Sequence, residues 1–243
     1  MKIKETLPTT VTLGNMVCGF ISILCILNNQ FEIAAWLIIA SMALDAFDGR
    51  LARMMKTTSK VGAQLDSMAD LVTFGIAPAI LMIKTCTNSP QSFLWIIGLF
   101  FMMCATLRLA RFNVQKENGL NIPKHFFTGL PTTLSGGTIA QLVILNRFLQ
   151  TKFEIDVIIT LLPFICLMLG ILMVSKIPFF NITGKISVNQ GIITLMLEFS
   201  AAILFFAISP QLALSTTLSC YLLICSMYGI VKSRQIRKGY STA

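Results

Sequence analysis

Long apolar segments separated by short polar connections are the feature of this sequence that most restricts its fold. A helix crossing the hydrocarbon core of a membrane needs roughly 20 consecutive apolar residues, a length that far exceeds a barrel strand. Pro, Asn and charged residues divide the chain into eight such segments, which cover about residues 8–28, 31–55, 60–84, 91–113, 128–149, 155–175, 189–208 and 211–231.

Composition supports the same fold class. The chain is 55% hydrophobic and 12% charged, whereas about 25% of the residues of a soluble domain are charged. We therefore predict an all-α integral membrane protein of about eight transmembrane helices. The segments leave no length for a separate soluble domain, so residues 1–243 are predicted to form one membrane domain.

The distribution of Lys and Arg predicts the orientation, because cytoplasmic connections are enriched in both. With the N-terminus inside, the outer connections hold only Lys84, Arg147 and Lys152, which leaves 16 of the 19 basic residues inside. Both termini are then cytoplasmic: residues 1–7, and a basic tail at residues 232–243 that lies on anionic lipid. We attribute the net charge of +9 to this bias and predict no nucleic-acid partner.

Four of the five aspartates fall in the interior of predicted spans, where an unpartnered carboxylate is costly. Asp45 and Asp48 are spaced i,i+3 on the second span, and Asp66 and Asp70 are spaced i,i+4 on the third, so each pair lies on one helical face. The two helices form a hairpin that turns near residues 57–59. At about 1.5 Å per residue both pairs reach similar depths below that turn. The sequence therefore predicts four carboxylates converging in one pocket open to the cytoplasm.

Four such carboxylates repel one another, and divalent cations supply the charge that stabilises them. A set of oxygen ligands without His or Cys favours Mg²⁺ or Mn²⁺, and two ions shared by four carboxylates are typical of phosphoryl-transfer sites. A structural alternative is that the aspartates pair with Arg50, Arg53 or Lys60. A second alternative is a divalent-cation transporter, although the remaining acidic residues do not continue toward the outer face.

The residues between the aspartates form a motif with a recognisable spacing. Gly49 and Gly62 lie near an aspartate on each helix, where a missing side chain permits either ligand approach or close helix packing. Arg53 is suited to bidentate phosphate binding or to orienting an aspartate. The full pattern is Asp45-x2-Asp48-Gly49-x2-Ala52-Arg53-x8-Gly62-x3-Asp66-x3-Asp70.

This pattern resembles the signature of the CDP-alcohol phosphatidyltransferase family at every fixed position. The resemblance implies a helical membrane enzyme, often a homodimer, with its active site between the second and third helices and open to the cytoplasm. It also implies a CDP-linked lipid donor bound near Gly49, Ala52 and Gly62. Asp45, Asp48 and Asp66 would be metal ligands, and Asp70 would be a metal neighbour that acts as general base.

Further stretches resemble the phosphatidylserine synthase branch of that family: Asp70–Ala79, Arg108–Asn113, Phe127–Pro131 and Leu172–Pro178. This resemblance implies CDP-diacylglycerol and L-serine as substrates and a bacterial inner membrane as the location. Arg108 and Arg111 are spaced i,i+3 at the cytoplasmic end of the fourth span. They suit a serine carboxylate or a lipid phosphate, or else anchor the helix as inside-facing charges. Asn113 suits the amino-acid group.

The acceptor alcohol is not decided by the family motif. Glycerol 3-phosphate or inositol phosphate would require more basic residues, which Arg108, Arg111 and Lys124 can supply, so both remain alternatives to serine. Thr128 and Gly129 are expected to open the fifth span, where a helix N-terminus favours an anion.

Overall fold

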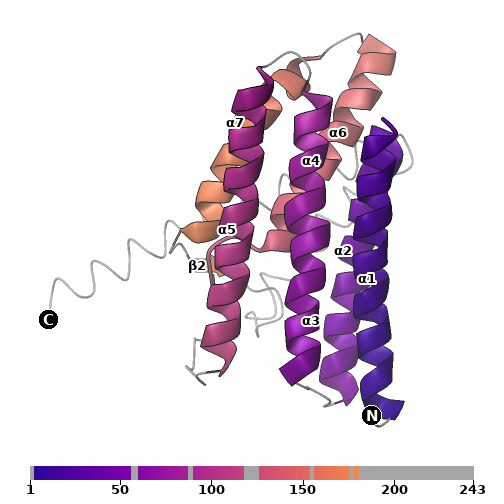
Figure 1. The fold of residues 1–243 in the computed structure, drawn as a ribbon, viewed down its shortest axis with the longest axis vertical. Helices are drawn as coiled ribbons and strands as arrows, with labels where there is room; N and C mark the ends of the chain where they lie inside the picture. The colour runs from indigo at the N-terminus through magenta and orange to yellow at the C-terminus, as the bar shows by residue number, and fades with distance from the viewer. Residues whose placement is uncertain are drawn as a thin grey trace, which may run out of the picture.

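The computed structural model describes residues 3–55, 60–86, 90–117, 126–153, 156–175 and 178–180 of the chain. Helices form most of this part, arranged in an elongated bundle (Figure 1). The elements are α1 (Ile3–Leu27), α2 (Phe31–Met55), α3 (Lys60–Asp70), the π-helix η1 (Leu71–Ile76), α4 (Ala77–Thr85), α5 (Gln91–Glu117), β1 (Phe126–Thr128), α6 (Thr132–Phe153), α7 (Val157–Val174) and β2 (Pro178–Phe180).

The helices correspond to the first six predicted segments, with two corrections. The third segment is not one uniform helix: α3, η1 and α4 follow one another in a single column, with a π-helical turn directly after Asp70. The fifth helix begins at Thr132 rather than near residue 128, because residues 126–128 form a strand and Gly129 takes a φ of 86°. The predicted spans at 189–208 and 211–231 lie outside the described residues.

Within the described residues, four helical segments are long and apolar enough to cross a membrane: Thr10–Leu27, Val61–Thr85, Gln91–Gln115 and Val157–Val174. Many of their large apolar side chains are exposed, which suits contact with lipid tails. Examples are Val17, Phe20, Trp95, Ile96, Phe164 and Met168, each between 55% and 67% exposed. The protein is therefore an all-α membrane protein, apart from two short strands among the described residues.

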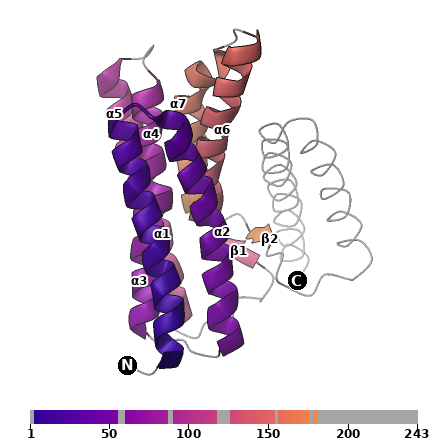
Figure 2. The ribbon, with the colours of Figure 1, turned by 90° about the vertical axis from the view of Figure 1, so that its right-hand side faces the viewer.

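α1 and α2 form an antiparallel hairpin (Figure 2). The turn places Asn29 at a φ of 60°, a conformation that Asn adopts more readily than most residues. The Gln30 amide donates to the Cys25 carbonyl at 2.8 Å and closes the turn. α1 also packs against α3 and η1, while α2 packs against α6, and α5 packs against α7. These contacts bring α2 and the α3–η1 column to opposite sides of the site described below.

The connection before α6 is held against the end of α7. β1 pairs antiparallel with β2, with Phe127 opposite Phe179, beside the lower half of α2 in Figure 2. The Leu130 amide donates to the Leu172 carbonyl at 3.1 Å. A Cβ on Gly129 would overlap the Met173 carbonyl oxygen and lie 3.1 Å from that of Ser175, so this position requires glycine both for its φ and for space.

Candidate active site

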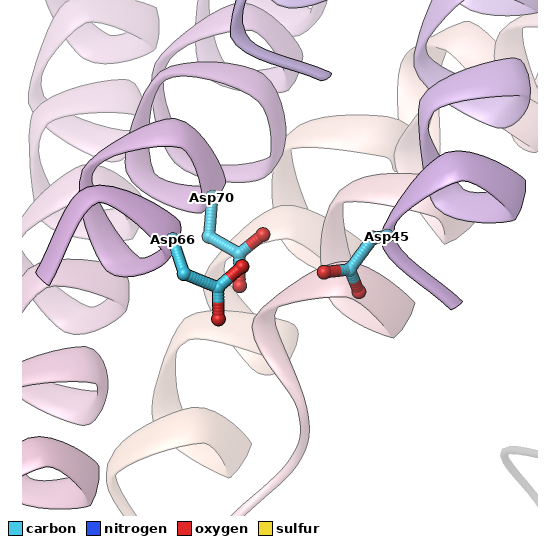
Figure 3. A group of neighbouring side chains, drawn as sticks. All are labelled: Asp45, Asp66 and Asp70. Carbon is cyan, nitrogen blue, oxygen red and sulfur yellow. The ribbon is translucent and has the colours of Figure 1, made fainter. Parts of the chain in front are cut away.

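Three carboxylates converge between α2 and α3 in the described part of the chain. Asp45 comes from α2, and Asp66 and Asp70 come from α3. One oxygen of each lies within 4.8 Å of the other two. Figure 3 shows Asp45 directed across the gap toward Asp66 and Asp70. The i,i+4 pair on α3 and the single residue on α2 thus meet at one depth, as the hairpin geometry predicts.

The three aspartates of this cluster differ in how deeply they are buried. Asp45 and Asp66 are half-buried, and Asp70 is buried at 9% exposure. Three carboxylates at this separation repel one another, more strongly where water is excluded. A ligand set made only of oxygens suits hard divalent cations such as Mg²⁺ and Mn²⁺ and does not suit soft metals. The cluster is therefore chemically suited to hold a metal ion.

A cationic side chain from α5 accompanies the carboxylates. Arg108 interacts electrostatically with Asp70 and with Asp45. Its Nη1 donates a hydrogen bond to the hydroxyl of Thr132, the first residue of α6, and its guanidinium lies 5.9 Å from the Phe112 ring centroid. Arg108 thus lies within electrostatic range of two carboxylates of the cluster and is held by a residue of a neighbouring helix.

Arg111 takes a different direction from Arg108, although the two are spaced i,i+3. Its Nη1 donates to the Val174 carbonyl at 3.0 Å, at the last residue of α7. Arginine side chains commonly satisfy terminal helix carbonyls in this way. Asn113, two residues further along α5, accepts a hydrogen bond from the Ser67 hydroxyl at 3.0 Å. The three predicted acceptor residues therefore have three different partners.

Other predicted site residues are placed only in part. Asp48, Gly49, Ala52 and Arg53 lie on α2, but their side chains are outside the part of the chain that the structure describes. Gly62 is half-buried in the first turn of α3, on the same helix as Asp66 and Asp70. Thr128 belongs to β1 and Gly129 to the connection after it, so neither is at the N-terminus of a helix.

Two residues near the site were missed by sequence reasoning. Thr132 holds Arg108 and Ser67 holds Asn113. Ser67 follows Asp66 directly, but its position in the motif is unrestricted and gives no signal. Thr132 follows the Phe127–Pro131 stretch, and a hydroxyl directly after a proline at a helix start was an available signal.

These features define a helical membrane protein with a metal-suited acidic cluster between two helices. The chain belongs to the CDP-alcohol phosphatidyltransferase family, because the sequence model of that family matches residues 5–180. This result confirms the family predicted from the aspartate motif, and the matched region contains every residue of the cluster.

The chain is also similar to several CDP-diacylglycerol–serine O-phosphatidyltransferases. It is 33% identical to that of Helicobacter pylori over 228 residues, which cover 93% of this chain and 90% of the relative. It is 32% identical to that of Methanocaldococcus jannaschii over 229 residues, covering 93% and 94%. It is 35% identical to that of Bacillus subtilis over 130 residues, covering 54% and 71%. The relatives thus span bacteria and an archaeon.

Proposed function

We propose that this protein is a CDP-diacylglycerol–serine O-phosphatidyltransferase, which converts CDP-diacylglycerol and L-serine to phosphatidylserine and CMP. The observation that carries the proposal is the convergence of Asp45, Asp66 and Asp70 within 4.8 Å, with Arg108 beside them. The relatives of that name, similar over 93% of this chain, support serine as the acceptor.

Asp45, Asp66 and Asp70 are the residues that would hold divalent cations, with Asp48 as a fourth ligand from α2. We propose two ions, Mg²⁺ or Mn²⁺, because four carboxylates shared by two ions match phosphoryl-transfer sites. When bound, the ions supply positive charge next to the pyrophosphate oxygens of the donor and reduce the cost of charge on departing CMP.

The chain's own residues perform the proton transfer and the positioning. Asp70 accepts the proton of the serine hydroxyl while that oxygen forms a bond to the phosphorus nearest the diacylglycerol. The bond from this phosphorus to the bridging oxygen of the pyrophosphate breaks, and CMP leaves with the bonding electrons. Asp70 is proposed for this role because it is the most buried of the three carboxylates, at 9% exposure.

We assign different residues around the carboxylate cluster to the two substrates. Gly49, Ala52, Arg53 and Gly62 are proposed to contact the CDP moiety, with Arg53 on a phosphate. Arg108 is proposed to bind the serine carboxylate or a donor phosphate, since it is directed at Asp70 and Asp45 and is held by Thr132. Asn113 lies five residues further along α5, with Ser67 as its partner.

The proposed setting is a single membrane domain of eight helices with both termini in the cytoplasm. The active site then lies between the second and third spans and faces the cytoplasm. Location in a bacterial inner membrane and a homodimeric assembly are part of the same proposal. The excess of basic residues on one side supports the orientation.

The test is release of CMP by the purified protein in detergent with CDP-diacylglycerol and Mn²⁺ or Mg²⁺. Serine, glycerol 3-phosphate and inositol phosphate are supplied in separate reactions. We expect release with serine, loss of release in Asp70→Asn, and loss after chelation. Glu32→Gln is the matched control, because Glu32 is an exposed carboxylate in the first turn of α2, 13 residues before Asp45.

Each other outcome has a distinct meaning. Release with another acceptor alone would keep the family and contradict the serine assignment. A folded, metal-binding protein that releases no CMP with any acceptor would contradict the enzymatic proposal and favour ion transport. Equal losses in Asp70→Asn and Glu32→Gln would show that the change acts through folding rather than through the proton acceptor.

A further inference from the structure

A π-helical turn begins directly after Asp70. η1 covers Leu71–Ile76, and its residues Thr73, Phe74 and Gly75 are buried. Such turns are rare and are frequently found at functional sites. One additional residue in a turn offsets the helical faces before and after it by about 100°, the rotation per residue of an α-helix. The turn therefore lets α3 direct Asp66 and Asp70 at the site while α4 directs a different face at the core.

Helix α1 contacts this turn through a glycine. A Cβ on Gly19 would overlap the Thr73 hydroxyl and would lie 2.9 Å from the Thr73 Cα, closer than such atoms approach in proteins. The Thr73 hydroxyl also donates to the carbonyl of Asn15, one turn before Gly19, at 3.1 Å. The backbone of α1 is thus pressed against η1 and hydrogen-bonded to it.

Helix α6 contacts the same turn through a second glycine. A Cβ on Gly136 would lie 2.7 Å from the Phe74 carbonyl oxygen and 2.8 Å from the Phe74 Cα. Both atoms belong to the backbone of η1 and cannot rotate away as a side chain would. Two helices that are distant in sequence therefore meet the π-turn at adjacent residues, and each meets it at a position where only glycine fits.

We infer that Gly19 and Gly136, together with Thr73, are positioning residues that fix the π-turn and thereby aim the Asp70 carboxylate at Asp45 and Asp66. A side chain at either glycine pushes on the backbone of η1, three or four residues after Asp70. The turn then shifts or relaxes, and the Asp70 oxygen moves relative to its two neighbours. The inference rests on the proposed function for its catalytic consequence, but its geometric part concerns the carboxylate cluster alone.

The experiment compares Gly136→Ala and Gly19→Ala with matched controls on the same helices. Gly137→Ala is the control on α6, because its Cβ would meet only the side chain of Met42, which can move. Gly14→Ala is the control on α1, because its Cβ would meet nothing within 4 Å. For each variant, Mn²⁺ affinity is measured by electron paramagnetic resonance without substrates, and kcat and KM for serine are measured separately.

In Gly136→Ala and Gly19→Ala we expect Mn²⁺ affinity to fall about tenfold or more. We expect kcat to fall between about tenfold and a hundredfold, as for a displacement of about 1 Å in a reacting group. KM for serine should change less, and both controls should stay within about twofold of the unmodified protein. Glycines that serve packing alone would lower the melting temperature and leave Mn²⁺ affinity and kcat unchanged, which would overturn the inference.

Thr73 provides a test if either alanine variant fails to fold. Thr73→Ser keeps the hydroxyl that donates to Asn15 and should retain Mn²⁺ affinity, whereas Thr73→Val lacks it and should bind Mn²⁺ more weakly. Equal affinities in these two variants would count against the inference. A wild-type protein that releases no CMP with serine would defeat the proposed function, while weaker Mn²⁺ binding in Gly136→Ala would still support the positioning role.

Discussion

Arg108 on α5 donates a hydrogen bond to the hydroxyl of Thr132, at the start of α6. This bond joins two helices at the level of the acidic cluster and holds the guanidinium near Asp70 and Asp45. An arginine side chain has many rotamers, and fixing one of them beforehand lowers the entropy cost of binding an anionic substrate.

Thr132→Val should therefore weaken catalysis more than it weakens folding. A hydrogen bond to a charged group is worth about 1.5–3 kcal/mol, which corresponds to a fall in kcat/KM between about tenfold and a hundredfold. Thr138→Val is the control, because the Thr138 hydroxyl bonds only within its own helix, to the Leu134 carbonyl at 2.7 Å. Steady-state CMP release by both variants checks the prediction, and equal values would contradict it.

Gly129→Ala should destabilise the protein. The substitution places a side chain at a φ of 86° and against the carbonyl oxygens of Met173 and Ser175, at a combined cost of about 2 kcal/mol or more. The melting temperature in detergent should fall by about 4 °C or more. Gly14→Ala removes a glycine from a helix where space is open, and it should leave stability unchanged or raise it slightly.

Metal binding should stabilise the fold through the acidic cluster. A ligand at a hundred times its Kd adds about 2.7 kcal/mol, so Mn²⁺ should raise the melting temperature and a chelator should lower it. In Asp66→Asn this shift should shrink strongly, because one of three converging carboxylates loses its charge. Glu32→Gln should keep the full shift. If Mn²⁺ raised the melting temperature of Asp66→Asn as much as that of the unmodified protein, the metal would bind elsewhere.

The thiol of Cys86 should be unreactive in the folded protein. Cys86 lies directly after the candidate span Val61–Thr85, is 2% exposed and donates to the Ile159 carbonyl at 3.3 Å. Burial raises its pKa to about 11, against a smaller opposite effect of a hydrogen bond with Thr85. About one thiol in a thousand is then ionised at pH 8, and alkylation should accelerate only as the pH rises toward that pKa.

Peptide mapping by mass spectrometry after maleimide treatment at pH 8 checks this prediction. Folded protein should leave the Cys86 peptide unlabelled, and denatured protein should label it fully. Cys18 and Cys25 are half-buried on α1 and serve as internal comparison sites in the same sample. Rapid labelling of Cys86 in folded protein at pH 8 would show that α4 and α7 do not enclose it.

Much of the site could be predicted because helical spacing is a local property. The i,i+4 spacing of Asp66 and Asp70, and the few residues that separate the two helices in the sequence, predict both beside Asp45 without reference to any other helix. The family and the membrane class follow from the same motif and from the apolar segments. The bounds of α2 agree with the predicted segment at 31–55, and a hydrogen-bonded turn precedes the helix.

The directions of the two arginines could not be predicted in this way. Arg108 and Arg111 share a helical face by spacing, but one meets the hydroxyl of Thr132 and the other meets the end of α7. Those partners come from helices 24 and 63 residues further along the chain. Only the packing of α6 and α7 against α5 decides which arginine turns toward the carboxylates.

The sequence by itself determined the membrane class, the helical segments of the described residues and the convergence of Asp45, Asp66 and Asp70, because these depend on hydrophobicity and on spacing along a helix. Only the tertiary structure decided that the helix after Asp70 contains a π-turn. That turn departs from regular helix geometry, and contacts from Gly19 on α1 and Gly136 on α6 define it. The local sequence of residues 71–76 does not indicate those contacts. The direction of the Asp70 side chain therefore depends on how the helices of the bundle pack together.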